Sequence, residues 1–249
     1  MSVAFARLGV LAALIALWSL VAASMPQGLF ASPAETLAAA KVMLGEGRLY
    51  SAILSSLQVY LAGTVLAAVF GIALGLVMGG LPFFGRVVDI FVYALAATPR
   101  VAFIPLVIVI LGLGLQAKVF IVFLGAVMPV ILNTYAGVRA ADRDLIEMAR
   151  AAGAGPRRIF AHVILPGAAP FLLTGLRIGA TIGLINTVVA ELYTAVSGLG
   201  GLLATYGASF RMAEYFVVVL ALSLIGVIVT EGLRFLENRL NRWRAEGGR

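Results

Sequence analysis

The side chains that most enzymes use for catalysis are scarce in this chain. It contains no cysteine and a single histidine, His162, which excludes disulfides and cysteine nucleophiles and argues against an all-protein zinc or haem site. The two lysines, Lys41 and Lys118, each follow an alanine, so the phosphate-binding sequence G-x-x-x-x-G-K-[ST] is absent. Energy for any work by this chain must therefore come from a partner or an ion gradient.

The polar segment over residues 142–166 predicts two short helices separated by a turn. Asp142 can cap the first helix, and Gly153 permits the left-handed backbone conformation that ends it. Pro156 suits the first turn of the second helix, which Pro166 is expected to break. Such a segment can lie flat beneath membrane helices and present a compact face to a soluble partner.

The segments that position this loop are apolar enough to cross a membrane. The 249 residues are 62% hydrophobic and 12% charged, about half the charge of a soluble domain. Because a helix needs about 20 apolar residues to cross the hydrocarbon layer, we expect six spans in a single transmembrane domain over residues 1–249. The expected spans are residues 8–25, 52–80, 87–115, 119–138, 167–190 and 215–238, with a cytoplasmic loop at 139–166.

Two of these stretches have special features. Residues 87–115 are too many for one straight helix and are interrupted by Pro99 and Pro105. Residues 8–25, preceded by Arg7, can also be interpreted as a secretory signal. The uncharged core of about 16 residues exceeds the usual 7–15, which favours a retained span.

The basic residues predict the orientation. With both termini in the cytoplasm, twelve arginines face the inner side and four basic residues face the outer side, as the positive-inside rule requires. The inner set is Arg7, Arg86, Arg139, Arg143, Arg150, Arg157, Arg158, Arg234, Arg239, Arg242, Arg244 and Arg249. The outer set is Lys41, Arg48, Lys118 and Arg211. The net charge of +7 therefore needs no nucleic acid partner.

Local patterns add two structural expectations. In the outer connection, Ser32-Pro33-Ala34-Glu35 predicts a helix with Ser32 as N-cap and Glu35 completing a capping box, and Gly45 can end it. Small residues also recur every four positions in two spans, which favours close packing within the chain over subunit dimerisation. They are Gly63, Ala67, Gly71, Gly75 and Gly79, and then Gly175, Gly179 and Gly183.

The loop resembles the EAA motif of binding-protein-dependent ABC importers, which reads E-A-A, three residues, G, nine residues and I-x-L-P. The residues at matching positions are Glu147, Ala149, Gly153, Leu165 and Pro166. Met148 replaces an alanine and Val163 an isoleucine, and both keep the apolar character.

Flanking segments, from about residue 50 to 243, resemble the nitrate/sulfonate/taurine/bicarbonate branch of these permeases. They are Ala102-Phe-Ile-Pro105-Leu106 with Gly112-Leu-Gly114, Asn133-Thr-Tyr-Ala-Gly137-Val, Gly175-Leu-Arg177 and Ser197-Gly-Leu-Gly200. The resemblance implies the type I ABC importer permease fold, an all-α integral membrane protein with six transmembrane helices. It also implies a non-catalytic subunit without a cofactor of its own.

The resemblance implies several partners in a bacterial inner membrane. Two permease subunits would work as a pair surrounded by membrane lipid, and a homodimer is favoured over paired paralogues. A cytoplasmic ABC ATPase, in two copies, would carry ATP and magnesium, and a periplasmic solute-binding protein would deliver the solute. The loop would dock into a cleft on the ATPase, so that ATP binding turns the pathway outward.

The resemblance also assigns roles within the loop. Glu147 is expected to make polar contacts at the ATPase cleft, Ala149 to pack closely, and Gly153 to fix the angle between the two short helices. The full coupling set is Glu147, Met148, Ala149, Arg150, Gly153, Arg157, Leu165 and Pro166.

A second group of polar residues lies at membrane depth. Ionisable groups there cost about 2.5–3.5 kcal/mol and so face protein or water. Arg100 follows the break at Pro99 and either lines a pathway or pairs with freed carbonyls. The candidate pathway residues, each of which can instead form an interhelical hydrogen bond, are Thr98, Pro99, Arg100, Asn133, Asn186 and Glu191.

The function expected is solute import. Arg100 and Arg177 favour a small anion such as a sulfonate, nitrate, bicarbonate or an organic acid. The alternative is a self-contained secondary carrier or channel that uses an ion gradient and needs no other chain. A membrane-embedded enzyme ranks third, because no paired carboxylates or nucleophile–histidine arrangement converges on one face.

Overall fold

A computed structural model describes residues 3–26 and 28–240, and all regular elements within these ranges are helical. The α-helices are α1 (Val3–Ser24), α2 (Pro33–Gly45), α3 (Arg48–Gly80), α4 (Pro82–Ala97), α5 (Ile104–Leu111), α6 (Leu115–Arg139), α7 (Arg143–Ala151), α8 (Pro156–Ile159), α9 (Leu165–Thr194), α10 (Gly198–Ala208) and α11 (Met212–Leu240). A 3-10 turn, η1 (Arg100–Phe103), precedes α5, and a π-helical turn, η2 (Phe160–Ile164), precedes α9. The predicted all-α fold class is confirmed. Arg242, Arg244 and Arg249 of the inner set lie outside the described residues.

Five helices in the described ranges are long and apolar enough to cross a membrane, and a bent pair makes a sixth candidate. The five are Phe5–Ser24, Arg48–Gly80, Leu115–Arg139, Pro156–Thr194 and Met212–Phe235. The bent pair, Pro82–Ala97 and Arg100–Leu111, meets at 82°. The bend falls where the sequence predicts an interruption, because Pro99 cannot extend α4 and holds Thr98 extended at ψ 134°.

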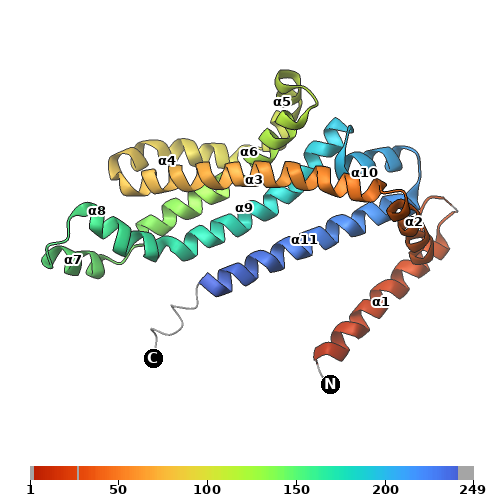
Figure 1. Ribbon diagram of the computed structural model, residues 1–249, viewed down its shortest axis with the longest axis horizontal. Coiled ribbons are helices and arrows are strands. Elements are labelled where there is room, and N and C mark those ends of the chain that lie inside the picture. The colour runs from red at the N-terminus through yellow and green to blue at the C-terminus, as the bar shows by residue number, and fades with distance from the viewer. Residues whose placement is uncertain (1–2, 27, 241–249) are drawn as a thin grey trace. The chain divides into compact units, whose positions relative to one another are not determined.

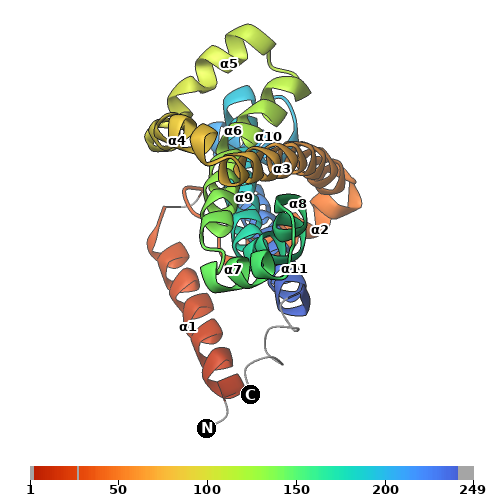
Figure 2. The same cartoon turned by 90° about the vertical axis from the view of Figure 1, so that its left-hand side faces the viewer.

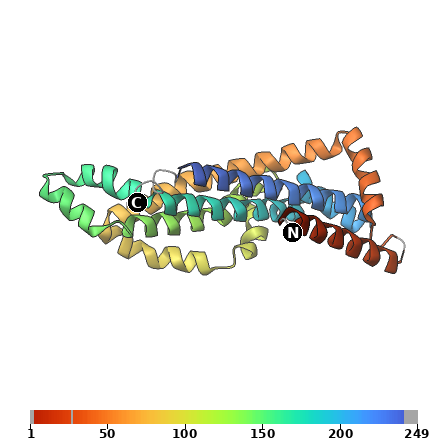
Figure 3. The same ribbon diagram turned by 90° about the horizontal axis from the view of Figure 1, so that it is seen from below.

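The described residues form two compact units, and α3, α9 and α11 each contribute to both. In unit 2 (Gln58–Ala190 and Gly226–Arg249), helices α4, α6 and α9 run together with the greater part of α3, as Figures 1 and 3 show. Within the same unit, α7 and α8 lie at one end of these helices, and Figure 2 is viewed from that end.

The glycine stripe of α3 explains how close this packing is. A Cβ atom added at Gly63, Gly71, Gly75 or Gly79 would come within 3.0 Å of a side chain of α6. The four side chains that they meet are Val122, Val130, Thr134 and Val138. Gly175 and Gly179 of α9 approach the same helix in this way, so both stripes serve packing within the chain.

The expected break at Pro166 is wrong. The chain continues from α8 through η2 into α9, and Pro166 lies in the first turn of α9. In the π turn, the Leu165 N–H donates to the Phe160 carbonyl, five residues back. Because the hydrogen-bond register changes just before the proline, its missing N–H and its ring are accommodated without ending the helix.

Unit 1 (Met1–Leu57 and Glu191–Ile225) contains α1, α2 and α10 with parts of α3, α9 and α11. The predicted capping box of α2 is confirmed, since the Ser32 hydroxyl accepts from the Glu35 N–H while the Glu35 carboxylate accepts from the Ser32 N–H. The rings of Trp18 and Phe30 pack on Phe216, with centroids 5.5 and 4.8 Å away. These contacts connect α1 and the loop after it to α11.

Candidate functional site

The loop of unit 2 has the first short helix and the turn that the sequence predicts, whereas the predicted second short helix continues unbroken into α9. Asp142 caps α7, because its carboxylate accepts from the N–H groups of Asp144 and Leu145 at 2.9 and 3.4 Å. Gly153 ends α7 with φ +80°. Its own N–H donates to the Arg150 carbonyl, and the next N–H donates to Ala149, which is the double hydrogen bond of a Schellman motif.

Short helix α7 exposes apolar side chains. Met148 is 64% exposed and Leu145 47% exposed, and the two lie one turn apart on the same face. Glu147 is also exposed, whereas Ala149 is half-buried. An exposed apolar pair beside a carboxylate on a rigidly capped helix is a surface that a partner protein can cover.

The other predicted coupling residues line two cavities or lie at the start of α9. Arg150 and Arg157 line a cavity of about 780 Å³ together with the last turn of α3. Ala149 lines a separate cavity of about 360 Å³, which it shares with His162. Leu165 and Pro166 are exposed at the start of α9.

The candidate pathway residues of unit 2 are held by backbone carbonyls. Arg100 donates from Nη1 to Gly125 O at 2.8 Å and from Nη2 to Ala96 O at 3.2 Å. The structure therefore shows the carbonyl-paired arginine that the sequence left as one of two possibilities. The other side chains each donate to a carbonyl of their own helix four residues earlier, at 2.8 Å; they are Thr98, Asn133 and Asn186.

Only some of this set come together. Arg100 and Asn186 line one narrow cavity beside Ile104 and Val107. Gly125 makes the approach possible, because a Cβ atom there would collide with the Asn186 amide. Glu191 belongs to unit 1 and has different surroundings.

Glu191 is fully buried in unit 1, where its carboxylate caps α10. The Gly200 N–H donates to Oε2 at 2.9 Å, and the Ser56 hydroxyl donates to the same carboxylate at 2.7 Å. The Ser56 oxygen in turn accepts from the Leu199 N–H at 2.8 Å. Two free N–H groups of the α10 N-terminus are thus satisfied by side chains, one of them, Ser56, far away in sequence, and the helix dipole favours a negative charge at this place.

The sequence did not reveal Ser56 as a partner of Glu191. Gly198 also proves essential here, because its φ is +87° and a Cβ atom would overlap the Glu191 carboxylate. The signal available was the Ser197-Gly-Leu-Gly200 motif, which begins six residues after Glu191, a distance that one tight turn can cover.

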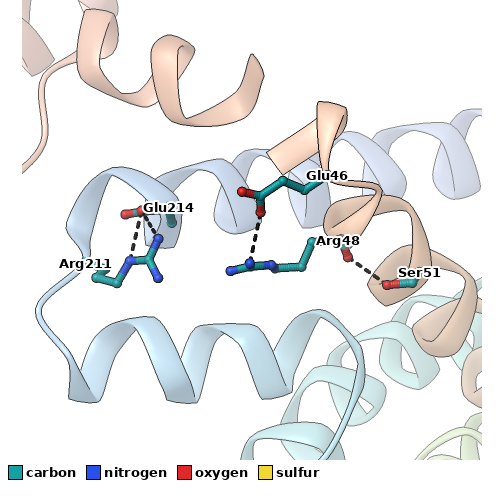
Figure 4. Close-up of polar contacts among 5 residues, drawn as sticks. All are labelled: Glu46, Arg48, Ser51, Arg211 and Glu214. Atoms are coloured by element: carbon teal, nitrogen blue, oxygen red, sulfur yellow. Dashed lines mark hydrogen bonds and ion pairs between the residues drawn. The ribbon is translucent and has the colours of Figure 1, made fainter. Parts of the chain in front are cut away.

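Two ion pairs in unit 1 were also not foreseen (Figure 4). Arg48 lies 3.0 Å from Glu46, and Arg211 pairs with Glu214. Hydrogen bonding to the Glu214 carboxylate raises the pKa of Arg211 above its ordinary value. The four side chains share a cavity of about 320 Å³ with Ala38, Val42 and other residues of α2. Because opposite charges balance there, this cavity carries no net charge.

Comparisons with known proteins agree on one family. Residues 67–242 match the family described as "Binding-protein-dependent transport system inner membrane component". The taurine transport system permease protein of Escherichia coli is 30% identical over 96% of this chain and 90% of its own length. The nitrate import permease protein of Synechocystis is 27% identical over 75% and 68%.

A solved structure shares the fold. The methionine ABC transporter MetNI, in an inward-facing conformation, has a chain that is 21% identical and superposes with a TM-score of 0.68. The match covers 78% of this chain and 96% of that one. At this identity, the likeness shows that the arrangement of helices is shared.

Proposed function

The chain belongs to the family of binding-protein-dependent transport system inner membrane components, and from that premise we propose that it couples solute import to a separate ATPase through α7. It is the permease subunit of an ABC importer and is not itself catalytic. In the proposed arrangement the loop at 139–166 and both termini face the cytoplasm, as the distribution of arginine favours. A paired permease, two ATPase subunits and a periplasmic solute-binding protein complete the transporter.

The exposed face of α7 carries this proposal. Met148 and Leu145 keep large exposed apolar surfaces. Glu147, between them in sequence, adds a charge that a partner can pair. Asp142 and Gly153 fix both ends of α7, so the face is preorganised for docking at little conformational cost.

A charge placed on this face tests the coupling role. With Met148→Asp, the ATPase should no longer copurify with the permease, and ATP-dependent uptake should fall to background. Because Met148 is 64% exposed, the permease itself should fold and insert as before. Met148→Leu is the matched control and should keep both activities. Normal ATPase binding by the aspartate variant, or uptake by the permease alone in proteoliposomes, would contradict the proposal and favour a self-contained carrier.

The solute we propose is a small anion of the sulfonate or nitrate class. The family members named for taurine and nitrate support this choice. Arg100 supports it too, because its guanidinium and the Asn186 amide line the same narrow gap in unit 2. Two of its N–H groups are used by carbonyls, and the others remain to meet an anion in a different conformation of the permease.

Uptake by the assembled transporter tests the pathway and the solute together. Arg100→Gln should lower uptake of the transported anion while leaving ATPase binding unchanged, since α7 is not altered. Asn133→Ala, which breaks a hydrogen bond within one helix, should have a smaller effect. A binding screen of the cognate solute-binding protein with taurine, other sulfonates, nitrate and bicarbonate then identifies the solute. Binding of cations or sugars alone would contradict the anion proposal.

A further inference from the structure

The larger of the two cavities described at the loop of unit 2 is lined by apolar side chains and two arginines. The end of α3 supplies Leu76 and Val77, and the start of the next segment supplies Leu81. The loop supplies Ile159, Phe160 and two arginines, Arg150 and Arg157. The cavity is about 780 Å³, which is within the range of sites that hold small amphiphilic molecules.

The charge of this cavity has one sign. None of the described residues that line it is acidic, and Arg150 and Arg157 form no ion pair within the described part of the chain. Two guanidinium groups in the lining of one cavity are suited to a phosphate group, which they can bind with paired N–H donors.

Part of the lining lies where the membrane surface is expected. Val77 lies near the end of the long apolar span Arg48–Gly80 and is 44% exposed, and Leu81 is 57% exposed. Apolar side chains at a span end, beside cations on the adjoining loop, match the boundary between acyl chains and phosphate headgroups.

The face of α7 that lines this cavity is not the face proposed to bind the ATPase. Ile146 and Arg150 line the cavity and lie one turn apart. Met148 is two residues from Ile146, which in an α-helix turns its side chain by about 200°, to the opposite side. One helix can therefore contact a second ligand while its outer face is covered.

We propose that this cavity binds an anionic phospholipid of the inner leaflet, with the phosphate at Arg150 and Arg157 and an acyl chain along Val77 and Leu81. The two arginines, placed by the sequence among the coupling residues, then bind lipid and hold the loop against the end of α3. The choice of leaflet rests on the proposed topology, whereas the binding itself does not.

Native mass spectrometry of the assembled transporter tests the proposal. Phosphatidylglycerol and phosphatidylcholine are titrated in parallel, and inorganic phosphate is added as a competitor. The wild type should retain phosphatidylglycerol preferentially, and Arg150→Gln with Arg157→Gln should weaken its binding by roughly fivefold per arginine. Replacement of both arginines by lysine should restore only part of the binding, because the charge is kept but the paired N–H donors are lost.

Arg158→Gln is the matched control. It removes an arginine next to Arg157 that lines the other cavity, so binding should stay at the wild-type level. Equal loss in this control, equal binding of phosphatidylcholine, or displacement by millimolar phosphate would overturn the lipid site. Loss of the lipid when the ATPase joins would also overturn it. A permease that binds the lipid but never the ATPase would contradict the proposed coupling role but not the proposed lipid site.

Discussion

The start of α10 in unit 1 and the end of α7 in unit 2 are both helix ends at a glycine with positive φ, but they differ in what surrounds that glycine. Gly198 faces a buried carboxylate, and no Cβ atom fits there. Gly153 has nothing within 4 Å of the place where a Cβ atom would be. The first glycine is needed for packing and backbone shape together, the second for backbone shape alone.

This difference predicts that substitutions near Gly198 affect the stability of the permease, whereas substitutions in α7 affect its coupling to the ATPase. Buried side chains and N–H groups around Glu191 in unit 1 are hydrogen-bonded to one another, so changes there should reduce the amount of folded protein. The polar and apolar groups of α7 point outward, so changes there should leave the fold intact and affect partners. Variants of the two regions should therefore differ in their free energy of unfolding, and the largest loss is expected in unit 1.

Gly198→Ala should destabilise the permease most. The left-handed conformation costs an L-residue about 1–2 kcal/mol, and displacing the Glu191 carboxylate from two donors raises the total to about 3 kcal/mol. Thermal unfolding in detergent measures this as a large fall in the apparent Tm. Gly201→Ala in the same helix is the control, since its Cβ atom would meet only ordinary contacts at 3.7 Å and its Tm should hold. Similar Tm values for the two variants would contradict the steric argument.

Ser56→Ala should come next, at about 1–3 kcal/mol, because it removes the hydroxyl that accepts from the Leu199 N–H and donates to the Glu191 carboxylate in a buried site. The same unfolding measurement applies. Its neighbour Ser55 is partly exposed, and its hydroxyl makes one long contact of 3.4 Å with Ser197. Ser55→Ala should therefore change stability by less than about 0.5 kcal/mol. An equal effect at both serines would show that the buried network is not what holds α10.

Gly153→Val should cost about 1–2 kcal/mol in backbone strain, confined to the loop. Its main effect should be on coupling, with loss of ATPase copurification and of uptake at nearly wild-type Tm. Gly155→Val is the matched control, because Gly155 has φ −74° and ψ 164°, an extended conformation that valine favours before a proline. If the Gly153 variant keeps its ATPase and its uptake, the turn has no coupling role.

These comparisons also show what the sequence can and cannot predict. Local rules predicted the caps at Asp142, Gly153 and Ser32, because each uses groups only a few residues apart. The bond between Ser56 and Glu191 joins residues 135 positions apart, and no periodicity encodes such a pairing. The break expected at Pro166 was wrong for a related reason. A change of hydrogen-bond register just before the proline removed the steric clash on which that prediction depended.

The candidate site was predictable to a similar degree. The spacing from Glu147 to Gly153 located α7 and its turn, but it could not say which side of the helix each residue takes once α3 is packed nearby. Arg150 therefore joined the coupling set by proximity in sequence, while in the structure it faces the cavity with Ile146. Arg100 was recognised as costly at membrane depth, and the carbonyls that it uses became known only from the fold.

Ser32→Ala should have the smallest effect of the series, about 1 kcal/mol, because it removes one exposed N-cap from α2 in unit 1.

The pH dependence of this effect identifies the capping box. Hydrogen bonds from the Ser32 N–H, and then from its hydroxyl, lower the pKa of Glu35 below its ordinary value. A lowered carboxyl pKa gives stability that is present above the unfolded-state pKa and is lost as pH falls through the folded-state pKa. The Tm difference between wild type and variant should therefore shrink on acidification, and Ser24→Ala, which loses only a hydroxyl bond within α1, should show no such trend. Because residue 32 keeps its backbone N–H in the alanine variant, a difference that stays constant with pH would mean that the bond from the Ser32 hydroxyl to the Glu35 carboxylate contributes nothing to stability.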